Sequence, residues 1–137
     1  MMPTRTELNR QLSNINRDIS AANSQISVIQ GQLTEINAAQ TELRPIISTA
    51  ANDRQRLDLL DCEDPHYWGG YYQGQCSTDY NESTVAMVSY TDRLDTWMEE
   101  LNSAEAKAEA SLEVQVRTLA GLNNSHRIVT NMLSNIR

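Results

Sequence analysis

The sequence predicts an all-α fold: a long antiparallel two-helix coiled-coil hairpin with an aromatic and glycine-rich turn. Three observations lead to this prediction. Residues 8–50 and residues 90–136 both space their apolar side chains in alternating steps of mostly four and three, as coiled coils do. The segment between them, DPHYWGGYYQGQC at 64–76, holds three of the five glycines in the chain and four of its seven aromatic residues.

With 137 residues the chain fits one domain. We expect residues 1–137 to form a single hairpin, with a first arm at about 6–61, a turn at about 62–78 and a second arm at about 79–137. Arms of similar length joined by a short turn fold back on each other, because each apolar stripe must find another.

The first arm follows the heptad pattern closely. Twelve of thirteen repeating positions, which form the seam of this arm, are apolar, and Gln40 is a polar interruption of the kind that fixes register. Pro45 lacks a backbone donor, but the pattern keeps its phase across it, so we expect a kink rather than a domain boundary. The seam positions are Leu8, Leu12, Ile15, Ile19, Ala22, Ile26, Ile29, Leu33, Ile36, Gln40, Leu43, Ile47 and Ala50.

The second arm is expected to begin near Ser77–Tyr80, where Ser77, Thr78 and Asp79 are candidate N-caps. Successive steps of four from Ala104 through Ala108 and Leu112 to Val116 predict a stutter, which locally unwinds a supercoil. The predicted seam of this arm is Tyr90, Leu94, Trp97, Leu101, Ala104, Ala108, Leu112, Val116, Leu119, Leu122, His126, Val129, Leu133 and Ile136.

A two-helix hairpin covers each seam on one side only, so we expect a partner to complete a four-helix bundle. The partner is another helical chain, or a second copy in a homodimer. The seam residues that we expect to contact it are Ile19, Ile26, Leu33, Leu94, Trp97 and Leu101.

The turn has two interpretations. Its glycines allow the chain to reverse, but they do not explain the aromatic residues beside them. These aromatics either form a small core over the helix ends or present an exposed recognition patch. The partner-binding candidates in the turn are Tyr67, Trp68, Gly70, Tyr71 and Tyr72.

Cys62 and Cys76 flank the turn and allow three arrangements. They form a disulfide that closes the turn, they are two free thiols, or they bind a metal together with His66 and neighbouring carboxylates. The last pattern lacks any Cys-x-x-Cys pair and is weak, so we expect no metal site and no other cofactor.

Composition argues against several functional classes. The net charge is −7, with one lysine and ten arginines, which does not suit a nucleic-acid partner or an anionic membrane. No apolar run is long enough for a transmembrane helix, and no cleavable signal peptide is expected, which favours the cytoplasm. No nucleophile is placed beside either histidine, so we expect no enzymatic activity.

The motif Trp68-Gly69-Gly70, in the turn of a predicted helical hairpin, resembles the WXG superfamily of type VII secretion proteins. The similarity extends to the small helical partners of LXG toxins in Gram-positive bacteria. This resemblance implies an adaptor or chaperone that bundles with a toxin's helical domain or a sister hairpin, with Trp68 and Gly70 in the export signal. The chain lacks the C-terminal Tyr-x-x-x-Asp/Glu signal of the family, so a partner would supply it and the chain could be secreted with its cargo. The alternative is a homodimeric coiled-coil spacer or scaffold protein without any role in secretion.

Overall fold

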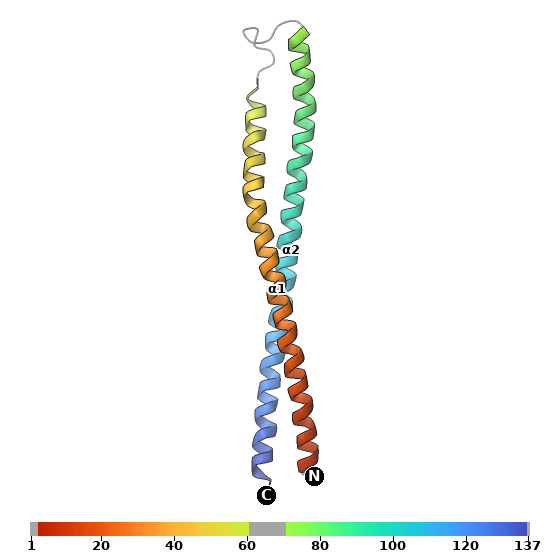
Figure 1. Cartoon of the computed structure of the whole chain (residues 1–137), viewed down its shortest axis with the longest axis vertical. Helices are drawn as coiled ribbons and strands as arrows, with labels where there is room; N and C mark the ends of the chain where they lie inside the picture. Colours follow the sequence, from red (N-terminus) through yellow and green to blue (C-terminus); the bar gives the residue numbers. More distant parts are fainter. Residues whose placement is uncertain (1–2, 61–70, 137) are drawn as a thin grey trace. The chain divides into compact units, whose positions relative to one another are not determined.

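The computed structural model describes residues 3–60 and 71–136. The described residues form two helices, α1 (Arg5–Asp58) and α2 (Tyr71–Asn135), and contain no strand. Figure 1 shows both helices in sequence colours, α1 from red to yellow and α2 from green to blue. The predicted all-α helical hairpin is therefore confirmed.

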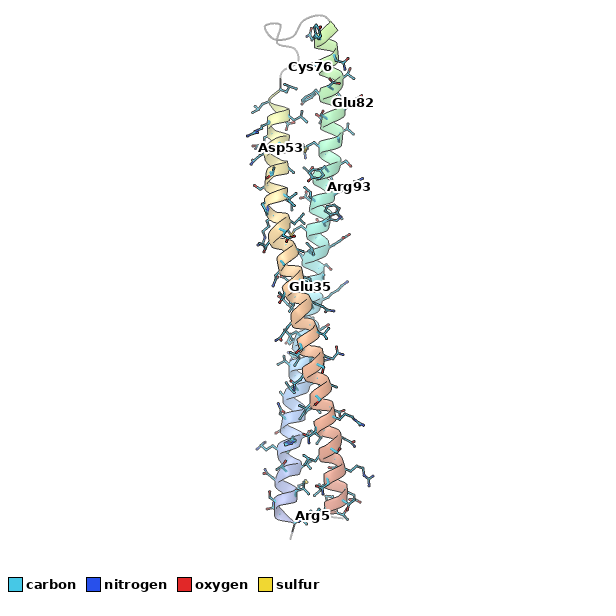
Figure 2. The ribbon with its side chains drawn as sticks, in the orientation of Figure 1. Arg5, Glu35, Asp53, Cys76, Glu82 and Arg93 are labelled. Carbon is cyan, nitrogen blue, oxygen red and sulfur yellow. The ribbon has the colours of Figure 1, made fainter. Side chains whose placement is uncertain are left out.

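The hairpin divides into two units that are described separately. The terminal unit comprises Met1–Ile36 with Ala104–Arg137, and the tip unit comprises Asn37–Ser103. In the terminal unit, Nη2 of Arg5 donates a 3.1 Å hydrogen bond to the carbonyl oxygen of Ile136, so the start of α1 lies beside the end of α2 (Figure 2). In the tip unit, Gln40 on α1 is hydrogen-bonded to Asn102 on α2. The two helices are antiparallel within each unit.

Helix α1 begins with a capping box. The backbone N–H of Glu7 donates to Oγ1 of Thr4, and the backbone N–H of Thr4 donates to Oε2 of Glu7, both at 3.1 Å. The carbonyl oxygen of Thr4 accepts the first helical bond, from Leu8 at 3.0 Å. This reciprocal arrangement satisfies backbone donors that would otherwise have no partner at the helix start.

The α1 seam has the residues that the sequence predicts. All thirteen seam positions are buried or half-buried, and Ala39 is the one other residue between 3 and 50 that is not exposed. Pro45 lies inside α1 with its side chain exposed, and the helix does not end there, whereas the expected kink stays a prediction. Because Pro45 projects away from the seam, the loss of its backbone donor does not interrupt the buried stripe.

Helix α2 begins earlier than the sequence suggests. It starts at Tyr71, so the predicted boundary at about residue 79 and the predicted turn over residues 71–78 are wrong. The expected N-caps lie inside the helix, where Oγ1 of Thr78 donates to the carbonyl oxygen of Gly74 at 3.1 Å and Asp79 accepts from Gln75. Side chains that cap helices elsewhere can bond within a helix, which is why the residue types alone misplaced the start.

The α2 seam is an unbroken heptad pattern. From Gln73 to Ile136, every position reached by alternating steps of four and three is buried or half-buried. The expected stutter is therefore wrong: Glu105 and Gln115 hold seam positions, and Val116 is exposed. The complete α2 seam is Gln73, Ser77, Tyr80, Thr84, Met87, Thr91, Leu94, Met98, Leu101, Glu105, Ala108, Leu112, Gln115, Leu119, Leu122, His126, Val129, Leu133 and Ile136.

Two aromatic residues of the predicted α2 seam lie beside it instead. Tyr90 and Trp97 are 45% and 50% exposed, while their neighbours Thr91 and Met98 are half-buried. Threonine is tolerated on this seam because its hydroxyl is bonded within the helix: Oγ1 of Thr91 donates to the carbonyl oxygen of Met87 at 3.0 Å. A buried hydroxyl with a partner avoids the cost of desolvation.

The tip unit contains a small apolar core. Leu43 and Ala50 from α1 meet Leu94 from α2, and Leu94 is only 2% exposed. The partly buried residues that pack against this core are Ile47, Met98 and Leu101. Both seams contribute to it, so the seams in this unit are used to hold the two helices of the hairpin together.

Candidate interaction surface

A groove in the tip unit is formed jointly by the two helices. Its volume is about 430 Å³, and Ile46 of α1 and Trp97 of α2 both line it. Leu43 and Leu101, which belong to the seams, lie deeper in the same groove. Ile46 is 44% exposed and Trp97 is 50% exposed, so each presents a large apolar side chain partly to solvent.

A second groove continues this apolar surface toward Tyr90. Its volume is about 250 Å³, and Pro45, Ile46 and Tyr90 are among the residues that line it. Ile46 therefore belongs to both grooves. The residues Ala39, Ile46, Tyr90 and Trp97 are here called the Trp97 edge.

The heptad pattern explains why these four residues share one edge. Each immediately precedes a seam position, and the two members on each helix are seven residues apart. Along Ala39–Ile46 and Tyr90–Trp97 the tip unit thus has a third apolar position per heptad on both helices, whereas Asp53 and Ser83 hold the next such positions. Apolar residues at three positions of seven are typical of helices in bundles, whereas a two-stranded coiled coil needs only two.

A third groove extends from Trp97 along α2. Its volume is about 500 Å³, and it is lined by Val85, Val88 and Trp97 together with more polar residues of the same helix. Val85 is 71% exposed. Trp97 therefore lies where the groove between the helices meets a groove on the surface of α2.

Acidic side chains surround the Trp97 edge. Glu42 of α1 and Glu100 of α2 line the groove of Trp97, and Asp53 (labelled in Figure 2) lines the groove of Tyr90. Among the residues that line the three grooves, Arg93 is the one cation. The electrostatic character of this surface is negative.

The two units differ strongly in charge. The sequence of the tip unit contains 12 acidic and 4 basic residues, a net charge of −8, whereas that of the terminal unit contains 6 acidic and 7 basic residues, a net charge of +1. The net charge of −7 for the chain thus arises in the unit that carries the Trp97 edge.

Most of the partner-contact residues expected from the sequence are used inside the hairpin. Ile19, Ile26, Leu33 and Leu101 are half-buried on the seams, and Leu94 is buried in the core of the tip unit. Of the six expected seam contacts, Trp97 is the one that is exposed, because it lies beside the seam rather than on it.

The candidates near the turn are described only in part. Tyr67, Trp68, Gly70 and Cys62 lie outside the described residues. Tyr71 is the first residue of α2, and Tyr72 is 70% exposed.

Cys76 is 8% exposed and disulfide-bonded. A disulfide at Cys76 does not agree with the alternative of two free thiols. Cys62 and the residues at 61–66 lie outside the described residues, so the Cys62–Cys76 pairing itself stays a prediction. Within residues 3–60 and 71–136, no three His, Cys, Asp or Glu side chains are grouped as metal ligands would be.

No helix in the described part of the chain combines the length and apolar character needed to span a membrane. Comparisons of the chain with protein-family models, with curated proteins and with solved structures find no match. The functional assignment therefore depends on the geometry of the hairpin and on the sequence motifs.

The apolar spacing of the sequence alone does not distinguish Ile46 as a contact residue, and it predicts Tyr90 on the seam, where the structure has Thr91 instead. The signal that identifies both is the seven-residue spacing from Ala39 to Ile46 and from Tyr90 to Trp97, in phase with the seams. It is visible only when the seam of α2 is assigned through Thr91 and Met98.

Proposed function

We propose that this chain is a non-enzymatic helical adaptor that accepts a helix of another chain on its Trp97 edge. The observation that carries the proposal is the groove between the helices, in which Trp97 is 50% exposed beside Ile46. The apolar face of the tip unit is wider than α1 and α2 need for each other. A further helix would cover the surplus and complete a bundle.

The energetics favour such a complex. An aromatic side chain buries about 150–250 Å² when it is fully covered. Covering the exposed half of Trp97 would therefore remove about 100 Å² from water, which is worth about 2–3 kcal/mol at about 25 cal/mol per Å². Tryptophan and tyrosine are enriched among residues that dominate interface energies, and the Trp97 edge contains one of each.

The biological setting that we propose is type VII secretion. Two features support it: the Trp68-Gly69-Gly70 motif and the helical hairpin, both of which resemble WXG-superfamily partners of LXG toxins. In this setting the docked helix belongs to a toxin's helical domain or to a sister hairpin. The chain acts in the cytoplasm as a chaperone and is secreted with its cargo.

Light scattering coupled to size-exclusion chromatography tests the proposal. The purified chain is measured alone and after co-expression with the products of neighbouring genes. We expect a defined complex with a helical neighbour, lost in Trp97→Ser and kept in Val114→Ser. Val114 is a matched control because it is 57% exposed on α2 but lies outside the three grooves.

The same experiment separates the proposal from its main rival. A stable homodimer that ignores every neighbour and tolerates Trp97→Ser would indicate a structural coiled-coil spacer instead.

A further inference from the structure

We infer that the helix docking on the Trp97 edge is basic: it inserts apolar side chains into the groove and places lysine or arginine residues against Glu42 and Glu100. This inference rests on the proposed function, because it names the chemistry of the partner. It excludes an acidic helix and a second copy of this chain as the occupant.

The positions of the Glu42 and Glu100 carboxylates are the first argument for a basic partner. Glu42 comes from α1 and Glu100 from α2, and both are exposed residues that line the groove of Trp97. Each helix thus supplies one negative charge beside the same apolar depression. The one ion pair within the described residues joins Arg117 to Glu113, so neither Glu42 nor Glu100 forms an ion pair with a described residue of the hairpin.

The net charge of the tip unit is the second argument, because it disfavours a second copy of this chain as the partner. Two tip units packed against each other would bring together two units whose sequences each have a net charge of −8. Like charges facing each other across an interface oppose association, whereas opposite charges favour it and select the partner. A basic helix gains from the same carboxylates that would repel a second copy.

The spacing of the apolar residues indicates that the docking partner is a helix rather than an extended segment. Tyr90 and Trp97 are seven residues apart on α2, a rise of about 10.5 Å at 1.5 Å per residue. Apolar residues at positions i and i+7 of a docked helix repeat at the same distance. A helix with flanking cations would therefore present matching apolar and charged positions along this edge.

Two synthetic peptides provide the probes. Both are 21-residue amphipathic helices, about three heptads, with identical leucine stripes, and they differ only in carrying lysine or glutamate at the flanking positions. Each is labelled with a fluorophore, and its binding to the full chain is followed by fluorescence anisotropy. The variants are Trp97→Ser, Ile46→Ser, the double variant Glu42→Gln/Glu100→Gln, and the control Val114→Ser.

We expect the lysine peptide to bind the unaltered chain at least about tenfold more tightly than the glutamate peptide. Binding of the lysine peptide should weaken by about tenfold or more in Trp97→Ser and Ile46→Ser, as for truncated interface anchors, and stay unchanged in Val114→Ser. In the Glu42→Gln/Glu100→Gln variant, the preference for lysine over glutamate should shrink severalfold. High salt should shrink it as well.

The unfavourable outcomes are distinct. Equal binding of both peptides would overturn the inference about charge and leave the helix-docking function standing. If the lysine peptide binds Trp97→Ser and Ile46→Ser as tightly as the unaltered chain, it is attracted to the acidic surface in general. This result would overturn the Trp97 edge as the binding site. Binding of neither peptide would count against both proposals. A homodimer that Trp97→Ser dissociates would show that a second copy occupies the edge, which the inference excludes.

Discussion

Nε2 of Gln40 donates a 3.0 Å hydrogen bond to Oδ1 of Asn102, and this bond joins α1 to α2 in the middle of an apolar seam. The side chain of Gln40 is 4% exposed, so it is the one buried polar residue in the described part of the chain. A shift in register would separate the two side chains and leave Gln40 without this partner. The pair therefore favours the observed register over its alternatives.

Replacing Gln40 should show how much stability the chain loses by having a polar residue at this seam position. We expect Gln40→Leu to raise the free energy of unfolding by about 1–2 kcal/mol, because a buried apolar side chain replaces a buried amide at a seam position. Asn102→Ala should lower it by about 1 kcal/mol, the net worth of one hydrogen bond. Urea denaturation followed by circular dichroism measures both. A Gln40→Leu variant less stable than the unaltered chain would show that the hydrogen bond outweighs apolar packing here.

The unbroken α2 seam gives a test at two adjacent residues. Gln115 lies on the seam and is half-buried, whereas Val116 is 49% exposed. We expect Gln115→Leu to stabilise the hairpin by about 1 kcal/mol, because it adds apolar area to the buried stripe. Val116→Gln should change the stability by less than about 0.5 kcal/mol, as surface substitutions usually do. Thermal melts of the two variants test the register. A stutter at this place would bury Val116 instead, so Val116→Gln would then be destabilising and Gln115→Leu would have little effect.

The capping box at the start of α1 can be tested with matched threonine variants. We expect Thr4→Ala to reduce stability by about 1 kcal/mol, because the N–H of Glu7 then loses its acceptor at the helix start. Thr34→Ala is the control: Oγ1 of Thr34 donates to the carbonyl oxygen of Gln30 inside α1, a bond that adds little to helix stability. Equal losses in both variants, measured by urea denaturation, would argue against a special role for Thr4.

The sequence was sufficient for the fold and for the whole α1 seam because apolar residues occupy twelve of its thirteen positions. It was less informative for α2, where Thr91, Glu105 and Gln115 hold seam positions while Tyr90 and Trp97 lie beside them. Choosing the more apolar of two neighbours then selects the wrong one. Packing against α1 determines which of two neighbouring residues on α2 is buried. The apolar pattern of α2 taken alone contains no information about this packing.

The Trp97 edge was missed for a related reason. Its members become recognisable only after the seam is fixed, because a residue beside a seam and a residue on it differ by one position. The start of α2 was misplaced because Ser77, Thr78 and Asp79 suit both a helix cap and, in the structure, a helix interior. The capping box at 4–7, by contrast, has the recognisable sequence signature Thr-x-x-Glu.

The last prediction concerns the cysteines. Cys76 is buried and disulfide-bonded, and the chain contains one other cysteine, Cys62. We expect an intramolecular bond, with no reactive thiol in the denatured, oxidised chain and two after reduction. Closing a loop of about 15 residues is worth about 3 kcal/mol in the chain-entropy model.

Reduction should therefore lower the free energy of unfolding by about that amount. Urea denaturation with and without reductant measures the change. The double variant Cys62→Ser/Cys76→Ser is the control, because reductant should not change its stability. Two reactive thiols before reduction, or a covalent dimer on a non-reducing gel, would contradict the intramolecular pairing.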